Sequence, residues 1–537
     1  MLIIPKINGS FLKREHYFTL QDQLDIHIGS FNPSIVDVFV KRMSQECQIQ
    51  VNVSANKNAV IKLIKNIDTE NEAYVVEIEQ NEIRLYALDD AGMTWALTSM
   101  YQMIVEAQKE NDGKLDCICF QDYPNYRHRG LLVDVARHFF HVEEMKKIIE
   151  EMSLYKLNVL HWHLTDDQAW RIESKIFPKL NEVSPSGNYY TQEQIKEIVS
   201  FAASRAVEVV PEIDMPGHAS AAIAAFPELS CFDEHIQVTE KPGIYKVIMC
   251  AGKESTYHWI YQLMDEIIPL FASNRIHLGG DEAPKDKWKT CSHCNAYMKL
   301  NQIDNYEDLQ GVFTEKVANY VTNKGKTVTC WNESLKSDHL SKDIAIQYWI
   351  EAEPTSYVYP HYEKGQPMIF SEVFHMYFDY PYCIVPLKKT YEYEPKIREN
   401  KRLNGANILG IEGAIWTERV STNEILESMI SPRIQALAEA AWTVDRNYED
   451  FLIRLKAHLE YIGLSKLGST PFEEATIHGE QAKAQAISFL QGFMGMMASP
   501  DVELGLSPEE MKGMAVMFIS NIFDEETAAG MLKSLNF

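Results

Sequence analysis

Eight short apolar segments, separated by segments with helical patterning, constrain the fold of this chain more than any other feature. In order, they read GLLVDV, NVLHWHL, VEVVPEID, RIHLGGDE, TVTCW, IAIQYW, PMIFSE and ILGIEGAIW. One intervening segment, residues 143–155, places Met145, Ile148 and Met152 on one face at the spacing of an α-helix. Strands that alternate with helices are typical of parallel βα units. Eight such units over about 320 residues predict a closed (β/α)8 TIM barrel.

Local signals support helices between the apolar segments. Thr191, with Gln194 three positions later, forms a capping-box pattern that predicts a helix start. Gly325 follows a helical stretch and predicts a helix end. Both signals fall between consecutive predicted strands, as a barrel requires.

The chain is too long, at 537 residues, for one ordinary hydrophobic core, and its ends have different patterns from the middle. Residues 1–122 contain short β-branched runs and one long helix, which predict a small α+β domain. Residues 123–465 hold the predicted barrel. Residues 466–537 are rich in Met and helix-forming residues and predict a helical C-terminal extension, which is also a candidate dimer face. We therefore expect an α/β protein with a flanking domain at each end of the barrel.

Composition excludes some classes of partner. Asp and Glu number 76 against 51 Lys and Arg, so the net charge of −25 argues against nucleic acid or an anionic membrane as a partner. The first residues do not have the pattern of a signal peptide, and no run of about 18 apolar residues occurs. The nine Cys residues form no disulfide-like grid. We expect a cytoplasmic protein.

Polar and aromatic side chains follow most of the apolar segments at their C-terminal ends. In a (β/α)8 barrel these ends form the active-site face, and a charged residue there usually belongs to the barrel mouth because parallel strands are buried on both sides. Carboxylates and aromatic rings without a metal or phosphate signature favour carbohydrate chemistry. The candidates are Arg137, Asp166, His218, Asp281, Glu282, Trp331, Trp349, Tyr377, Asp379, Trp416 and Glu418.

Several candidates have an alternative structural interpretation. Arg137 could form an ion pair with Asp134, and the Trp residues could belong to the core. His161 and His163 alternate on one strand and could bind a metal, although packing beneath the site is the favoured interpretation.

Cys291 and Cys294 form a C-x2-C motif, but a zinc site needs a second pair, and none is evident at a suitable spacing. We therefore predict no cofactor and no metal among the site residues, and we leave open whether the C-x2-C motif binds metal.

Five motifs, in order across residues 128–445, resemble those of family 20 glycoside hydrolases, the β-N-acetylhexosaminidases. They are HRGLLVDVARHFF, NVLHWHLTDDQAWRIE, EIDMPGHA, HLGGDE and GAIWTE. The resemblance implies a substrate with a terminal β-linked N-acetylhexosamine, on an oligosaccharide or glycoconjugate. It also implies substrate-assisted catalysis, in which the substrate's own acetamido oxygen forms an oxazolinium ion and water opens that ion with retention.

The resemblance also assigns roles to the candidates. Glu282 would act as general acid and then base, and Asp281 would orient the acetamido N–H and stabilise the cation. Asp166 and His218 would form a polar relay that supports Glu282. Two adjacent carboxylates cannot both ionise cheaply, so we expect one raised pKa in the pair; a raised pKa would suit the acid, Glu282, and an ionised Asp281 would suit the cation. The other expected contacts are Tyr377 with the acetamido oxygen, Trp331, Trp349 and Trp416 with the acetamido group and sugar face, and Arg137, Glu418 and Asp379 with ring hydroxyls.

Two other functions remain open at this stage. The same residues in a wider pocket would release a disaccharide, as a lacto-N-biosidase does, although Arg137 and Glu418 as hydroxyl clamps favour a single sugar. A non-catalytic glycan-binding protein on the same barrel is the other alternative. The present chain retains each side chain that catalysis requires, so we expect an exo-acting enzyme for terminal GlcNAc or GalNAc.

Overall fold

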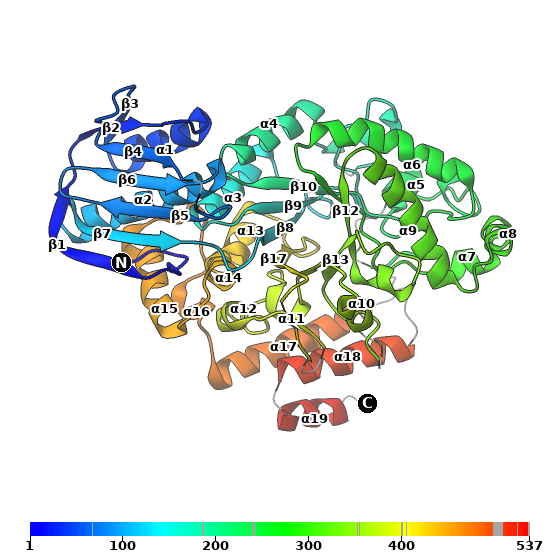
Figure 1. Cartoon of the computed structure of the whole chain (residues 1–537). Helices are drawn as coiled ribbons and strands as arrows, with labels where there is room; N and C mark the ends of the chain where they lie inside the picture. Colours follow the sequence, from blue (N-terminus) through cyan, green and yellow to red (C-terminus); the bar gives the residue numbers. More distant parts are fainter. Residues whose placement is uncertain are drawn as a thin grey trace.

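The computed structural model describes residues 1–537 except 67, 185–186, 239–240, 242, 352, 354, 399–400, 404, 498–507, 524 and 535–537. Its centre is a closed barrel of parallel strands in the order β10-β11-β12-β13-β14-β17-β8-β9 (Figure 1). The strands are β8 (His128–Asp134), β9 (Val159–His163), β10 (Glu208–Glu212), β11 (Arg275–His277), β12 (Thr327–Trp331), β13 (Ala345–Tyr348), β14 (Met368–Phe370) and β17 (Ile408–Ile415). Each of the eight apolar segments supplies one strand, which confirms the predicted barrel.

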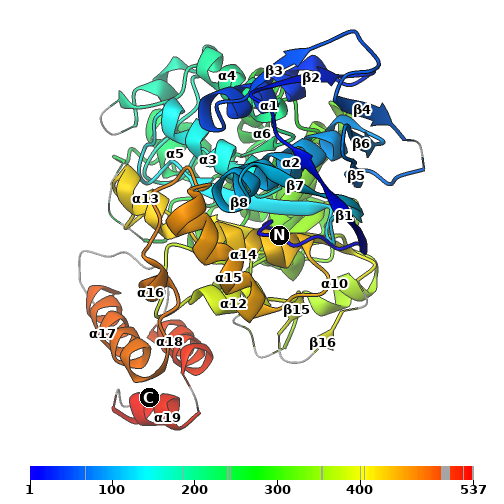
Figure 2. The same cartoon turned by 90° about the vertical axis from the view of Figure 1, so that its left-hand side faces the viewer.

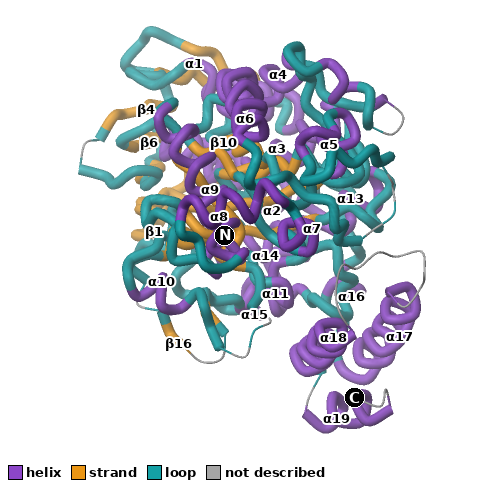
Figure 3. Tube along the Cα trace, turned by 90° about the vertical axis from the view of Figure 1, so that its right-hand side faces the viewer, coloured by secondary structure: helices purple, strands orange, loops and turns teal. Residues whose placement is uncertain are grey.

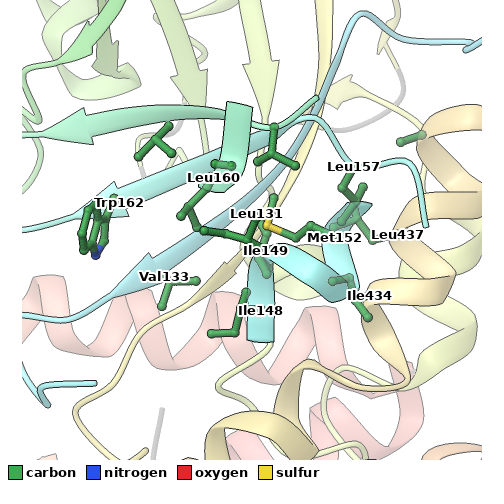
Figure 4. Close-up of a cluster of buried hydrophobic side chains, with 14 of the residues drawn as sticks. Leu131, Val133, Ile148, Ile149, Met152, Leu157, Leu160, Trp162, Ile434 and Leu437 are labelled. Atoms are coloured by element: carbon green, nitrogen blue, oxygen red, sulfur yellow. The ribbon is translucent and has the colours of Figure 1, made fainter. Parts of the chain in front are cut away.

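Helices of the first four units pack around the barrel as the patterning predicts. α3 (Val142–Leu154) buries Ile148, Ile149 and Met152 against strands β8 and β9, and Figure 4 shows these side chains meeting Leu131 and Leu160. Burying these side chains removes their apolar surface from water and stabilises the contact between helix and sheet. The other helices of this half are α4 (Gln192–Ala203), α5 (Ser220–Ala225), α6 (Glu254–Ile267), α7 (Asp286–Thr290), α8 (Ser292–Asn301) and α9 (Tyr306–Asn323).

Both local helix signals are confirmed. α4 starts at a complete capping box, in which the Thr191 hydroxyl and the Gln194 side chain each bond to the other's backbone. α9 ends at Asn323, and Gly325 follows with a φ of 80°. A positive φ is the backbone conformation that glycine adopts without strain.

The remaining units are less regular than the sequence suggests. A short 3₁₀ turn follows β12, and among the described residues between β13 and β14 the helix is the five-residue α10 (Tyr359–Glu363). The segment between β14 and β17 contains α11 (Val373–Met376), α12 (Leu387–Glu392) and the pair β15 (Lys396–Ile397) and β16 (Lys401–Arg402). After β17 come α13 (Asn423–Ile430) and α14 (Arg433–Trp442). The long segment after β14 therefore lies at the barrel mouth instead of forming one covering helix.

An N-terminal sheet and two helices precede the barrel. The sheet order is β1-β7-β5-β6-β4-β2-β3, and helices α1 (Pro33–Glu46) and α2 (Asp90–Glu110) pack against each other and against the sheet (Figure 2). Its strands are β1 (Phe11–Thr19), β2 (Gln23–His27), β3 (Gln50–Val53), β4 (Ile61–Lys65), β5 (Tyr74–Ile78), β6 (Ile83–Ala87) and β7 (Lys114–Asp122). This arrangement confirms an α+β domain.

Helices also form the C-terminal part of the chain. α15 (Tyr448–Ala457) lies beside the N-terminal sheet, whereas α17 (Gly479–Met497) and α18 (Pro508–Ile522) lie below the barrel (Figures 1 and 3). The short helices α16 (Phe472–Ala475) and α19 (Glu525–Ser534) accompany them. Within the described ranges, we found no helix with the length and apolar character needed to cross a bilayer.

Candidate active site

A glycine turn after β11 delivers the two adjacent carboxylates to the barrel mouth. Gly279 and Gly280 have φ values of 65° and 102°. A Cβ atom on Gly279 would overlap the carboxylate of Asp214, and the Gly280 N–H donates to that carboxylate at 3.0 Å. Glu282 itself has a φ of 45°. A non-glycine residue in this region is strained, and such strain is often found at functional sites. The HLGG sequence thus lets the chain turn closely enough to present Asp281 and Glu282 together.

His218 faces both carboxylates from the turn after β10. Its Nε2 atom lies 3.6 Å from an oxygen of Asp281 and 3.5 Å from an oxygen of Glu282. On the other side of the ring, Nδ1 lies 3.1 Å from Asp166 and 3.3 Å from Asp167. The structure therefore brings together the four residues that the sequence linked as an acid pair and its relay.

Burial and charge set the protonation of this cluster. Burial raises the pKa of Asp281 to about 6; His218 opposes the rise and Glu282 adds to it. Burial disfavours the charged ring of His218, but Asp166 and Asp281 outweigh that effect and raise its pKa well above the usual range. A cationic ring therefore separates two pairs of carboxylates at neutral pH. The sequence led us to expect a raised pKa at the acid, whereas in the structure burial raises the pKa of Asp281, whose side chain is 14% exposed.

Arg137 connects three carboxylates at the mouth. Its guanidinium lies 2.8 Å from Asp166, 3.2 Å from Asp134 and 3.7 Å from Glu418. The ion pair with Asp134 is therefore present, and it leaves Arg137 beside Glu418. The Glu418 side chain is 32% exposed, so this end of the group faces the open side of the mouth.

Aromatic rings surround the carboxylates. Trp349 stacks on Tyr377 with ring centroids 6.0 Å apart, and Trp416 lies 6.2 Å from Tyr377 and 6.0 Å from Trp331. Trp349 and Trp416 are partly exposed, whereas Trp331 is buried and donates its indole N–H to Glu212 at 2.7 Å. Trp331 thus lies beneath the mouth, and the other two rings form its wall.

Tyr377 and Asp379 come from the irregular segment after β14. Tyr377 forms an isolated parallel bridge with Ala414 of β17, which holds it at the strand end. Burial raises the pKa of Asp379 to about 7, with a further rise from Glu418. The Oδ1 atoms of Asp379 and Asp281 are both buried, and neither has a hydrogen-bond partner. Buried acceptors without a partner are costly.

A buried polar network beneath the mouth was missed by the sequence analysis. Glu212 accepts from the ring of His163 at 2.5 Å and from Trp331, and His163 also bonds Asp166 at 2.8 Å. Glu412 bonds the ring of His161 at 2.8 Å and that of His128 at 2.7 Å. Glu212 and Glu412 lie inside apolar segments, and a charge inside a strand buried on both sides was the available signal.

Glu333 is a further residue at the mouth, and it is not among the candidates from the sequence. It accepts from the indole of Trp349 at 3.1 Å. Burial, with an added effect of Asp281, raises the pKa of Glu333 to about 8. Glu333 therefore fixes the orientation of Trp349, and its raised pKa keeps it largely uncharged beside Asp281 at neutral pH.

Three groups of described residues at the site have a spacing that could hold a metal ion. They are the group of His161, Glu212 and His277, the group of Asp166, Asp167 and His218, and the group of Asp214, His218 and Asp281. Burial opposes a charge on His161, but Glu412 and Glu212 outweigh it and raise its pKa to about 9. With its ring protonated, His161 forms ion pairs with Glu412 and Glu212. The adjacent carboxyl groups at the mouth can serve two purposes: one can transfer a proton, and the other can stabilise a positive charge beside it.

Two family models match the chain. The model for the catalytic domain of glycosyl hydrolase family 20 matches residues 126–445, and the model for domain 2 of that family matches residues 1–123. The first model covers more than half of the chain and includes each of the candidate residues.

Curated relatives carry related names. A β-hexosaminidase from Porphyromonas gingivalis is 31% identical over 441 residues, which are 76% of this chain and 56% of that protein. A β-N-acetylhexosaminidase from Cellulomonas fimi is 31% identical over 427 residues, which are 75% of this chain and 80% of that protein. The alignment thus leaves a large part of the P. gingivalis protein unmatched.

Solved structures share the fold. An exo-β-N-acetylglucosaminidase from Vibrio harveyi, solved in complex with N-acetylglucosamine, has a TM-score of 0.78 and 28% identity, and the match covers 88% of this chain and 78% of that one. A β-N-acetylhexosaminidase from Bacteroides fragilis also has a TM-score of 0.78 and 28% identity, over 89% of this chain and 99% of that one.

Proposed function

This chain belongs to glycosyl hydrolase family 20, a family of glycoside hydrolases, and from this premise we propose that it is an exo-acting, retaining β-N-acetylhexosaminidase. Its substrates are oligosaccharides or glycoconjugates with a terminal β-linked GlcNAc or GalNAc. The names of the C. fimi and V. harveyi proteins support this substrate class. The observation that carries the proposal is the pair Asp281 and Glu282, which share one histidine and lie within an aromatic wall.

In the first step, Glu282 acts as the general acid. It donates its proton to the glycosidic oxygen while the bond from that oxygen to the anomeric carbon breaks. The acetamido oxygen of the same sugar attacks the anomeric carbon, so the product is a cyclic oxazolinium ion. Asp281 accepts the hydrogen bond of the acetamido N–H and places a negative charge beside the developing cation.

In the second step, Glu282 takes a proton from water as that water attacks the anomeric carbon. The ring of the oxazolinium ion opens, and its electrons return to the acetamido group. Two displacements at one carbon retain the β configuration. His218, 3.5 Å from Glu282, keeps a positive charge beside the carboxylate in both steps.

The remaining residues orient the sugar. Tyr377 donates its hydroxyl to the acetamido oxygen, and Trp349 and Trp416 exclude water from the acetamido group and pack against the sugar face. Arg137 and Glu418, 3.7 Å apart, bind neighbouring ring hydroxyls. This pair would close the pocket around a single terminal sugar, which favours an exo-acting enzyme.

The test is fluorophore release from aryl glycosides that differ at one position of the sugar. The proposal expects rapid hydrolysis of the β-GlcNAc and β-GalNAc substrates and no hydrolysis of the β-glucoside, which lacks the acetamido nucleophile. Equal rates on all three would contradict substrate assistance. Faster release from a disaccharide glycoside than from the monosaccharide would contradict the exo assignment.

A further inference from the structure

Four buried cysteines from three distant parts of the sequence meet outside the active site. Cys231 and Cys250 lie in the long segment between β10 and α6, and Cys291 and Cys294 lie at the start of α8. Their sulfur atoms all lie within 4.8 Å of one another. The sequence analysis found no second pair for the C-x2-C motif, because Cys231 and Cys250 are far apart along the chain. The fold supplies that pair.

The sulfur separations match a tetrahedral metal site. Cys250 lies 3.6 Å from Cys294 and 3.8 Å from Cys291, and Cys231 lies 3.9 Å from Cys294. Zinc binds thiolates at about 2.3 Å, so the sulfur atoms of a tetrahedral zinc site are about 3.8 Å apart. A disulfide would need about 2.05 Å. The measured separations therefore fit four ligands around one ion and do not fit sulfur–sulfur bonds.

The backbone around the cysteines is organised as a binding site. A Cβ atom on Gly252 would overlap the backbone of His293 and Cys294, so only glycine lets these two segments approach. The Gly252 N–H is directed at the sulfur of Cys250, the Cys250 N–H donates to Leu229 at 2.7 Å, and the Lys253 ammonium donates to the carbonyl of Ser230 at 2.6 Å. The Gly252 N–H thus supports a sulfur, as outer groups of a metal site do, and the other two donors bond to carbonyls and hold the backbone next to Cys231 and Cys250.

We propose that Cys231, Cys250, Cys291 and Cys294 bind one structural zinc ion. Four thiolates in tetrahedral geometry are the donor set of a closed structural zinc site, in which the metal has no position for a substrate. The ion joins the loop after β10 to the loop after β11.

These two loops carry the residues of the candidate active site. His218 precedes Cys231 in the first loop, and Asp281 and Glu282 precede Cys291 in the second. The turn at Gly217 packs directly on the backbone of Asp281 and Ala283. The ion thus holds together, from outside the barrel, two segments that must stay in register at the mouth.

The test is the metal content of the full-length chain, purified without chelators or an affinity tag that binds metal. We expect one zinc per chain by elemental analysis, and loss of that zinc in Cys231→Ser and in Cys294→Ser. Cys117→Ser, which changes a buried thiol of β7 in the N-terminal domain, serves as the matched control and should retain it.

A second measurement uses the wild-type protein, so it tests the proposal even if the cysteine variants fail to fold. Wild-type protein stripped of zinc and loaded with Co²⁺ should show the intense thiolate charge-transfer absorption and the visible bands of tetrahedral cobalt. Reloading should also restore the melting temperature that stripping lowers. Substoichiometric zinc with no cobalt–thiolate absorption, disulfides among the four cysteines, or iron in place of zinc would each overturn the proposal, and none of these results depends on glycosidase activity.

Discussion

At the scale of single residues, a substitution of Glu282 tests the proposed chemistry most directly. Glu282→Gln keeps the size and hydrogen-bonding capacity of the side chain and removes its proton transfer. We expect kcat to fall by about 10²–10⁴-fold on substrates with poor leaving groups, and by less on an aryl glycoside whose leaving group needs little protonation. The measurement is kcat for both substrate types.

Asp286→Asn is the matched control for that substitution. It changes an exposed carboxylate four residues further along, at the start of α7, so a comparable loss of activity would mean that disturbance of this segment, and not loss of acid catalysis, accounts for the effect. A Glu282→Gln enzyme with a near-normal rate on both substrates would remove the assignment.

The raised pKa of Asp281 predicts the acid limb of the pH profile. Because burial raises this pKa to about 6, the carboxylate becomes protonated at a higher pH than an ordinary aspartate, and below about 6 it no longer accepts the acetamido N–H. We expect kcat/KM to fall as pH drops through about 6. Asp281→Asn should have a low kcat/KM at every pH and lack this limb. A wild-type profile that is flat down to pH 4.5 would contradict the role.

At the scale of elements, the C-terminal helices contact the segment that carries Tyr377 and Asp379. Phe518 of α18 packs edge-on against Phe374 with ring centroids 5.0 Å apart, and lies 6.1 Å from Tyr380. We predict that Phe518→Ala lowers stability by about 1–3 kcal/mol, less than a fully buried ring because Phe518 is only partly buried, and raises KM because the segment loses a support.

Thermal unfolding and steady-state kinetics measure these two effects. Phe232→Ala serves as the control. The ring of Phe232 is 50% exposed, so its removal should change neither the stability nor KM. An unchanged KM in Phe518→Ala would mean that the helices stabilise the fold without positioning the site.

The elements also show where pattern reasoning succeeds. All eight barrel strands were predicted because each is a run of apolar residues buried on both faces. β1 was missed because it lies at a sheet edge with only Phe18 buried, so its sequence has no alternation to detect. The sequence could not fix the register of Tyr377 in the segment after β14, and in the structure its bridge to Ala414 sets that register. A contact between distant strands leaves no local pattern.

At the scale of the whole molecule, the same limit applies to side chains brought together by topology. Asp281 and Glu282 could be predicted because they are adjacent and end a strand. Cys231 could not be linked to Cys291, nor Glu212 to Trp331, because barrel closure and loop packing, and not sequence spacing, make them neighbours. Strand ends predict what lies at a barrel mouth, whereas its supports must be found in three dimensions.

A buried ion pair joins the N-terminal domain to the barrel. Lys156, which follows α3, lies 3.0 Å from Asp122 of β7, and both side chains are fully buried. Lys156 also donates to the hydroxyl of Tyr74 at 2.7 Å, and Trp442 donates to Asp122 at 3.0 Å. Removing one partner of such a pair leaves an uncompensated charge in the interior. We therefore expect Lys156→Met to lower the free energy of unfolding by about 3–5 kcal/mol.

The domains should also lose their coupling in that variant. In the wild type we expect a single unfolding transition, because the two domains share one buried interface, and in Lys156→Met we expect the N-terminal domain to unfold first. Denaturant unfolding followed by far-UV circular dichroism and by tryptophan fluorescence measures this, since Trp442 packs across the interface on Trp95. Lys147→Met is the control. The Lys147 side chain, which pairs with Glu427, is half exposed, and a surface ion pair contributes about 0–1 kcal/mol.

An equal loss of unfolding free energy in Lys147→Met and Lys156→Met would mean that the buried pair does not couple the domains. Partial recovery of stability in the double variant Lys156→Met with Asp122→Leu would identify the uncompensated charge of Asp122 as the cause.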